Sequence, residues 1–279
     1  MDKRYWLAIV PVAAFGSMGL VVRMVGLNGL QTTFFASLAS AAFFSLLLLR
    51  KGMLFNAFSK RGTKYVVALG AAGALNNVSY FYAYNLTTIS NAVFSHYLAP
   101  VLVLFLAPLV VGERVKRRAW AFLFMALSGL GILLAGNLNA SSNHLLGIAA
   151  GALSAVGFAF GVLLPKKLAG EYEPKELVFA QMVFTSLILL PFILYSPPSL
   201  EQKDLAPLLL LGVFYQGVNI TWFFKAVQLL PAQRVAVITY LEPVVATLLA
   251  ALFLNETPGA LTLVGGSFIL LACYMATRK

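Results

Sequence analysis

The sequence predicts an all-α integral membrane protein with ten transmembrane helices, arranged as two inverted five-helix repeats around a central cavity. Three observations lead to this prediction. The 279 residues are 61% hydrophobic and only 10% charged, with a mean hydropathy of +0.88, which leaves too little polar surface for a soluble domain. The apolar segments reach the ~20 residues that a helix needs to cross a bilayer. Residues 80–131 align with residues 223–274 at a constant offset of 143 without a gap, which indicates a duplication.

The individual helices follow from long apolar runs separated by short polar or proline-containing segments. The first run extends at least to Val22, which is longer than the core of a signal peptide, so we expect a retained helix. The ten predicted helices cover residues 5–24, 30–49, 64–85, 90–111, 117–136, 145–166, 176–195, 206–230, 232–254 and 259–277.

The uncharged segment 137–143 joins the two halves of the chain. We therefore expect the first five-helix repeat over residues 1–139 and the second over residues 140–279, with no separate soluble domain. The chain has a single cysteine, Cys273, so an intramolecular disulfide is excluded.

The distribution of Lys and Arg predicts that both termini face the cytoplasm, because cytoplasmic loops carry an excess of these residues. In that orientation only Arg23 and Lys203 lie outside and Lys225 lies within a helix. Arg234 is interpreted as one of the topology-setting charges, with attraction of an anion as the alternative. The cytoplasmic side receives Lys3, Arg4, Arg50, Lys51, Lys60, Arg61, Lys64, Arg114, Lys116, Arg117, Arg118, Lys166, Lys167, Lys175, Arg234, Arg278 and Lys279.

Loop charges predict that the second repeat is inverted relative to the first. Five helices per repeat is an odd number, so equivalent loops should lie on opposite sides of the membrane and differ in charge. Residues 113–118 contain four basic side chains, whereas the equivalent segment 255–259 contains none. Conversely, Asn91 in a predicted outer loop corresponds to Arg234 in an inner loop.

The ten-helix layout with paired halves resembles the drug/metabolite transporter superfamily, in particular its members with two EamA-type repeats. The resemblance rests on the segment from Tyr240-Leu241-Glu242-Pro243 to Asn255-Glu256 and on its weaker copy from Tyr97-Leu98-Ala99-Pro100 to Gly112-Glu113. It covers nearly the whole chain and implies a cavity lined by the first, third, fourth, sixth, eighth and ninth helices, with the fifth and tenth at the periphery. Members of this superfamily transport amino acids, purines, sugars, nucleotide sugars, phosphorylated metabolites and drugs.

Glu242 is the main candidate for a functional charge. It lies ten residues into the ninth predicted helix, or about 15 Å along it, so the carboxylate should face a cavity or a partner. It could couple transport to protons, bind a substrate ammonium group, or serve a structural role. The first repeat has Ala99 at the equivalent position, so any role that needs an acid in both halves is absent.

The third and eighth helices supply further candidates for substrate binding. Asn76 and Tyr80 are four residues apart and share a helix face, while Asn219 is the repeat equivalent of Asn76, with Tyr215 and Trp222 on either side of it. Amides on facing helices could bind a polar ligand between aromatic walls. The alternative is that the amides bond between helices and the aromatic residues pack or lie at the membrane interface.

Several other residues complete the candidate set. His96 could relay protons or act as a neutral interhelical donor, and Tyr97 and Tyr240 are repeat equivalents beside the two motif prolines. Lys225 could contact a substrate carboxylate or Glu242, or extend to the lipid headgroups.

Glycine and proline patterns predict how the helices pack and bend. Gly147-xxx-Gly151 and Gly157-xxx-Gly161 give the sixth helix small faces for close approach. Pro100 and Pro243 occupy equivalent positions and are expected to kink the fourth and ninth helices.

The function expected from the sequence is secondary transport of small organic metabolites by alternating access, rather than enzymatic catalysis. Amino acids or related amphipathic metabolites, moved by export across the inner membrane of a prokaryote, are the favoured substrates. The alternatives are a facilitative exchanger or channel for nucleotide sugars, purines or drugs, and a membrane-embedded enzyme or lipid-handling protein. The expected partners are the substrate, the bilayer and, with coupling, protons. We expect a monomer or weak homodimer, with no cofactor, metal or nucleic acid.

Overall fold

The computed structural model describes residues 3–22, 24–50, 58, 60–87, 89–135, 144–253 and 259–278. Within these ranges the chain forms helices and short connections, without a strand. In chain order the elements are η1 (Lys3–Tyr5), α1 (Trp6–Val22), α2 (Gly29–Leu49), α3 (Thr63–Leu86), α4 (Ile89–His96), α5 (Ala99–Val110), α6 (Arg117–Leu134), α7 (Leu145–Lys167), α8 (Pro174–Tyr195), α9 (Gln202–Leu209), the π-helix η4 (Leu210–Asn219), α10 (Ile220–Leu229), α11 (Ala232–Ile238), α12 (Leu241–Phe253) and α13 (Ala260–Thr277). The predicted repeat boundary at 139/140, Arg23 and the Asn255-Glu256 pair lie outside the described residues.

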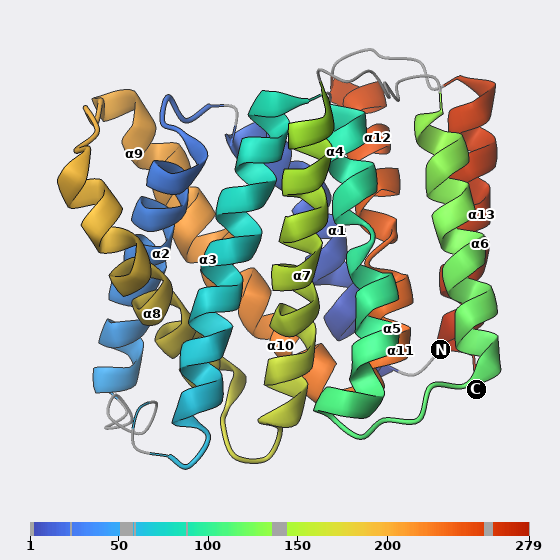
Figure 1. The fold of residues 1–279 in the computed structure, drawn as a ribbon, viewed down its shortest axis with the longest axis horizontal. Helices are drawn as coiled ribbons and strands as arrows, with labels where there is room; N and C mark the ends of the chain where they lie inside the picture. The colour runs from blue at the N-terminus through green and yellow to red at the C-terminus, as the bar shows by residue number, and fades with distance from the viewer. Residues whose placement is uncertain are drawn as a thin grey trace.

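The helices form a bundle in which the start of α1 and the end of α13 lie at the same end (Figure 1). Among the described residues, nine helices or runs of consecutive helices are long and apolar enough to cross a membrane. This confirms the predicted all-α membrane class. The predicted crossing that is not among these nine is the third, which corresponds to α3. Its 24 residues span about 36 Å but include the polar Asn76, Asn77 and Ser79. The tenth crossing and the inversion of the repeats remain predictions.

The helices α6 and α13 pack together at one edge of the bundle (Figure 1). Their backbones approach closely because both carry glycine at the crossing. A Cβ atom on Gly129 would stand 2.7 Å from the carbonyl oxygen of Gly265, and one on Gly265 would stand 2.4 Å from the carbonyl oxygen of Gly129. This edge pair corresponds to the fifth and tenth predicted helices, which the family resemblance placed at the periphery.

The fourth and ninth predicted helices are each interrupted just before their motif proline. The break between α4 and α5 falls at residues 97–98, and the break between α11 and α12 falls at residues 239–240. Proline lacks an N–H group and its ring clashes with the carbonyl four residues earlier. The kinks expected at Pro100 and Pro243 therefore occur as interruptions of the α-helix. Tighter backbone hydrogen bonds bridge them, from the Leu98 N–H to the Ser95 carbonyl oxygen at 3.3 Å and from the Tyr240 N–H to the Val237 carbonyl oxygen at 3.2 Å.

Two tyrosines join these breaks to each other. The hydroxyl of Tyr240 donates to the carbonyl oxygen of Tyr97 at 2.9 Å, and the hydroxyl of Tyr97 donates to the carbonyl oxygen of Thr239 at 3.3 Å. Thr239 lies four residues before Pro243, so its carbonyl oxygen lacks the usual donor four residues later and accepts instead from the Glu242 N–H at 3.1 Å, in a tighter turn. The Tyr97 hydroxyl is thus a second donor to the Thr239 carbonyl oxygen, and the two tyrosine hydroxyls link the breaks to each other.

The eighth predicted helix begins earlier than expected and is not a regular α-helix. It starts at Gln202 instead of residue 206, because Glu201 and Asp204 form a capping box in which the Glu201 N–H donates to Asp204 Oδ2 at 3.1 Å. Its middle part is the π-helix η4, a form that is rare in proteins and frequent near functional sites.

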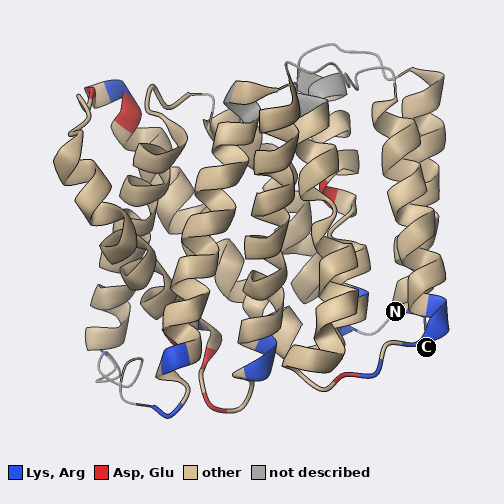
Figure 2. Cartoon of the chain, viewed as in Figure 1, with Lys and Arg blue, Asp and Glu red and all other residues tan. Residues whose placement is uncertain are grey.

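Most charged residues lie at the two ends of the bundle, and most Lys and Arg residues lie at the end that holds the termini (Figure 2). Several are paired there: Lys60 Nζ lies 2.6 Å from Glu176 Oε2, and Lys166 Nζ lies 3.2 Å from Glu113 Oε1. We call this the basic end. The expectation that it faces the cytoplasm remains a prediction.

Candidate functional site

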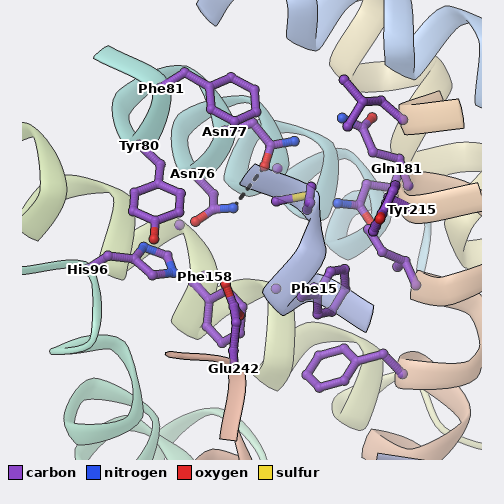
Figure 3. A pocket seen from close by; sticks show the side chains of 18 of the residues that line it. Phe15, Asn76, Asn77, Tyr80, Phe81, His96, Phe158, Gln181, Tyr215 and Glu242 are labelled. Carbon is purple, nitrogen blue, oxygen red and sulfur yellow. Dashed lines mark hydrogen bonds between the residues drawn. The ribbon is translucent and has the colours of Figure 1, made fainter. Parts of the chain in front are cut away.

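A cavity lies among the helices at the centre of the bundle (Figure 3). It has a volume of about 100 Å³, counted as the space open to the centre of a water molecule. One water needs roughly 10–15 Å³ on this measure, so the cavity accommodates several waters or a small organic molecule. Its lining consists of Phe15, Met18, Thr32, Gly73, Asn76, Asn77, Tyr80, Phe81, His96, Gly157, Phe158, Gly161, Gln181, Leu211, Tyr215, Gln216, Ile220, Phe223, Phe224 and Glu242.

Glu242 is the only Asp, Glu, Lys or Arg among these lining residues. It is the second residue of α12, immediately before Pro243, so the break after α11 places its side chain at the cavity. The Tyr97 hydroxyl, whose bond to the Thr239 carbonyl oxygen is long at 3.3 Å, is also a hydrogen-bond partner of the Glu242 carboxyl group and can donate to only one of the two at a time. The cavity therefore offers a carboxyl group that is held by a neighbouring helix segment and faces no cationic side chain from the described lining.

His96 and Tyr80 form one wall of the cavity. Their rings are stacked with centroids 4.1 Å apart, and His96 Nδ1 lies 2.7 Å from Ser154 Oγ. Phe158 meets the His96 ring edge-on at 5.3 Å. This packing fixes the imidazole, and its remaining ring nitrogen is the one that could serve a ligand or a proton relay.

Amide groups supply hydrogen-bond acceptors to the cavity. Asn76 Nδ2 donates to Asn77 Oδ1 at 2.9 Å, while Asn76 Oδ1 has no partner within the described part of the chain. The same holds for Gln181 Oε1, although the Gln181 side chain is 94% buried. An unpaired buried acceptor costs free energy, so both oxygens are suited to receive N–H groups from a ligand.

Five predicted site residues thus line the cavity: Asn76, Tyr80, His96, Tyr215 and Glu242. Tyr215 also shares a hydrogen bond of 2.7 Å with the hydroxyl group of Ser17, which joins η4 to α1.

The other five predicted site residues lie elsewhere. Tyr97 and Tyr240 stand behind the cavity wall at the two helix breaks. Asn219 donates through Nδ2 to the carbonyl oxygen of Pro11 at 3.0 Å, so it forms the interhelical bond that was its alternative role. Trp222 and Lys225 are exposed.

Trp222 and Lys225 lie outside the cavity lining, which agrees with their alternative roles at the membrane interface and at the lipid headgroups. On α10, Phe223 and Phe224 are buried and line the cavity. They occupy the places that we expected for their neighbours Trp222 and Lys225. Trp222 and Lys225 are three residues apart and share the opposite face, which the bundle leaves uncovered.

Several lining residues were not identified from the sequence, although the 143-residue offset could have found them. Phe15 and Phe158 are repeat equivalents, as are Tyr80 and Phe223, and all four line the cavity. A further equivalent pair, Phe81 and Phe224, lines it as well. In a chain this rich in phenylalanine, an aromatic residue alone carries no signal, but an aromatic residue repeated at the offset does.

Removing the hydroxyls that join the helix breaks tests whether this connection supports the cavity. We expect Tyr97→Phe and Tyr240→Phe each to destabilise the protein by roughly 0.5–1.5 kcal/mol, the usual contribution of one hydrogen bond. Tyr97 also bonds to Glu242, so only Tyr97→Phe should weaken ligand binding as well. Thermal unfolding in detergent and ligand titration measure the two effects. Equal ligand affinity in both variants would contradict the link between Tyr97 and the site.

Comparison with known proteins gives a consistent assignment. The model of the EamA-like transporter family matches residues 3–135 and 145–278. The chain is 27% identical to the pseudopaline exporter of Pseudomonas aeruginosa over 98% of this chain and 95% of that protein. It is 24% identical to the S-adenosylmethionine uptake transporter of Rickettsia prowazekii over 69% of this chain and 64% of that protein. A crystal structure of 19% sequence identity superposes with a TM-score of 0.83, covering 99% of this chain and 97% of the other, and shares the fold.

Proposed function

Because the chain belongs to the EamA-like transporter family, we propose that it is a secondary transporter that moves small amine-bearing metabolites by alternating access. That it is a multi-pass membrane transporter and not an enzyme follows from the family and from the transporter relatives. The substrate class, the direction and the coupling are the proposal. Amino acids and related amphipathic metabolites are the favoured substrates.

The observation that carries this proposal is the chemistry of the cavity lining. Glu242 supplies the only Asp, Glu, Lys or Arg side chain among the lining residues, and Asn76 Oδ1 and Gln181 Oε1 are acceptors that lack donors there. An ammonium group brings a positive charge and three N–H donors, so it complements this set. A phosphate group brings negative charge and acceptors, and it would meet a carboxylate without a compensating cation. Phosphorylated metabolites and nucleotide sugars are therefore disfavoured.

The rest of the lining fits the apolar part of an amphipathic substrate. Phe15, Phe158 and Phe223 contribute rings, and the ring of Phe158 lies 6.3 Å from that of Phe223. Aromatic side chains bury large apolar areas and bind cations over their faces. A molecule with one amine and one apolar group would use both parts of the cavity.

Alternating access is supported by the way in which the two halves share the cavity. Repeat-equivalent residues line it from both halves, and equivalent breaks interrupt the helices on either side of Tyr97 and Tyr240. Broken helices at a site formed by both repeats are a recurring feature of transporters. In this proposal the halves rock about the cavity and open it first to one side of the membrane, then to the other.

Glu242 is also the proposed coupling group, because the same carboxyl can bind either a proton or a substrate ammonium group. That competition gives proton-driven export, in which protons entering on one side displace the amine to the other. A facilitative exchanger is the alternative, and the two relatives named above differ in direction, one being an exporter and the other an uptake transporter. We further propose a monomer or weak homodimer in the inner membrane of a prokaryote, with the basic end in the cytoplasm.

The test is transport by the purified chain in proteoliposomes with a panel of radiolabelled amino acids, purines and nucleotide sugars. We expect saturable counterflow of one or more amino acids or related amines, accelerated by an opposing pH gradient. Counterflow distinguishes a carrier from a channel. Movement of nucleotide sugars or phosphorylated metabolites without any amine would contradict the substrate class.

A further inference from the structure

A second cleft opens at the basic end, between the start of α6, the start of α11 and the end of α13. It has a volume of about 50 Å³ on the same measure as the central cavity. Four of its lining residues are cationic, namely Lys116, Arg118, Arg234 and Arg278. The rest of the lining is polar or apolar, with Ala119, Phe122, Pro231, Gln233, Val237 and Ala276. No acidic side chain lines this cleft among the residues that the structure describes.

Two of the cations are held in place by tyrosines. The guanidinium group of Arg234 donates to the hydroxyl of Tyr5 and lies 5.8 Å from the centre of its ring. Arg278 has the same relation to Tyr274, with the ring centre at 4.5 Å. These neutral partners orient the guanidinium groups without neutralising them. The entropic cost of ordering both arginines is therefore met before a ligand binds.

The positive charge of this cleft is uncompensated, unlike that of other cations at the basic end. Lys60 is paired with Glu176, Lys166 with Glu113 and Lys175 with Glu173, at 2.6, 3.2 and 2.6 Å. None of the four cleft cations has an ion-pair partner in the described ranges.

The start of α6 increases the positive potential in the cleft. Lys116 is the N-cap residue and makes no side-chain cap hydrogen bond, and the first turn of α6 holds no acidic residue. Free backbone N–H groups at a helix start favour an anion and are disfavoured by nearby cations. The charges of Lys116 and Arg118 are therefore electrostatically unfavourable at the start of α6. An anion bound in the cleft would offset this cost.

From this geometry we infer that the cleft between α6, α11 and α13 binds the phosphate headgroup of an anionic phospholipid. A headgroup fits because α6 and α13 form the edge of the bundle, where lipid reaches the protein (Figure 1). The apolar side chains of Phe122, Val237 and Ala276 line the same cleft. Basic pockets between transmembrane helices bind anionic headgroups in this way. The occupant places the negative charge of its phosphodiester among the four cations, and it links the start of α6 to the C-terminal end of α13 independently of the central cavity.

The test compares lipid binding by the full chain with that of two variants of equal charge. Lys116→Gln/Arg118→Gln removes two cleft cations, and Arg61→Gln/Lys64→Gln removes two cations at the same end, at the start of α3. Binding of phosphatidylglycerol and phosphatidylcholine to the protein in detergent is measured by native mass spectrometry and by the shift in the thermal midpoint. Since each cation near an anionic lipid surface is worth about a fivefold change in binding, the cleft variant should bind phosphatidylglycerol roughly 30-fold more weakly.

The wild-type protein and the Arg61→Gln/Lys64→Gln variant should both prefer phosphatidylglycerol to phosphatidylcholine. Because removing cations from a helix start stabilises that helix, the loss in the cleft variant does not arise from unfolding. An equal loss in both variants would overturn the cleft as the site, since it would show general charge attraction. Inorganic phosphate serves as the soluble probe. If phosphate raises the thermal midpoint of the wild-type protein and phosphatidylglycerol does not, the assignment of the cleft to a lipid is overturned.

Discussion

Replacing Glu242 by glutamine is expected to weaken substrate binding by about 10- to 100-fold and to abolish transport driven by a pH gradient. The substitution keeps the shape of the side chain but removes its carboxyl group. Glu242 is the only Asp, Glu, Lys or Arg in the described cavity lining. A hydrogen bond to a charged group contributes roughly 1.5–3 kcal/mol, which corresponds to this range of affinity. A glutamine also cannot release a proton, so gradient-driven accumulation should stop. Binding titrations and accumulation assays in proteoliposomes measure the two effects.

Glu201→Gln is the matched control, because Glu201 is an exposed acid that pairs with Lys203 at 2.8 Å at the other end of the bundle. An exposed pair of this kind contributes at most about 1 kcal/mol to stability, so transport should change little. The same variant separates the two proposed roles of Glu242, which are substrate binding and proton coupling. If Glu242→Gln still exchanges substrate in the absence of a pH gradient, Glu242 serves in coupling but is not needed for binding. If the variant accumulates substrate fully under a gradient, Glu242 has no coupling role.

Replacing Gly157 by alanine is expected to destabilise the protein by roughly 1–3 kcal/mol and to lower ligand affinity. A Cβ atom at residue 157 would stand 2.6 Å from the carbonyl oxygen of Ala72 and 2.6 Å from the backbone nitrogen of Asn76. Both contacts are to backbone, so α7 and α3 must move apart, and overpacking of this kind has that cost. The shift displaces Asn76, and the affinity of the cavity should fall with the stability.

Gly161→Ala is the control on the same helix, one turn further along. A Cβ atom at residue 161 would meet nothing within 4 Å, and alanine is favoured over glycine in a helix by about 0.5–1 kcal/mol. The control variant should therefore be at least as stable as the wild type. Thermal unfolding of the two variants in detergent is the measurement. Similar stability of both variants would contradict the close contact of α3 with α7 at Gly157.

The sequence predicted the helices well because their signals are local. Apolar runs of about 20 residues and the polar segments between them set the boundaries of most helices to within a few residues. Kinks at the two motif prolines were also predicted, since proline acts on its own preceding turn, although the helices were expected to continue through them. The early start at Gln202 was missed, because its capping box consists of acidic residues that resembled an ordinary loop.

The residues of the candidate site were only partly predictable. Glu242, His96 and Asn76 stood out because polar residues are costly inside a membrane. Trp222 and Asn219 also stood out in the sequence, but they do not line the cavity. Trp222 faces outward, and Asn219 is bonded to the carbonyl oxygen of Pro11. A helix has one face toward the cavity, and the rotation of α10 about its axis is set by packing against its neighbours.

The sequence by itself therefore determined the class of molecule: an all-helical membrane transporter of two related halves, with a carboxyl group deep in its ninth helix. It did so because composition, helix length and an exact repeat offset are properties of the chain alone. Only the tertiary structure decided which side chains meet. The stacking of His96 on Tyr80, the joining of the two helix breaks by Tyr97 and Tyr240, and the cluster of four cations beside α6 all depend on helix rotation and contact between distant segments, which arise when the whole bundle packs.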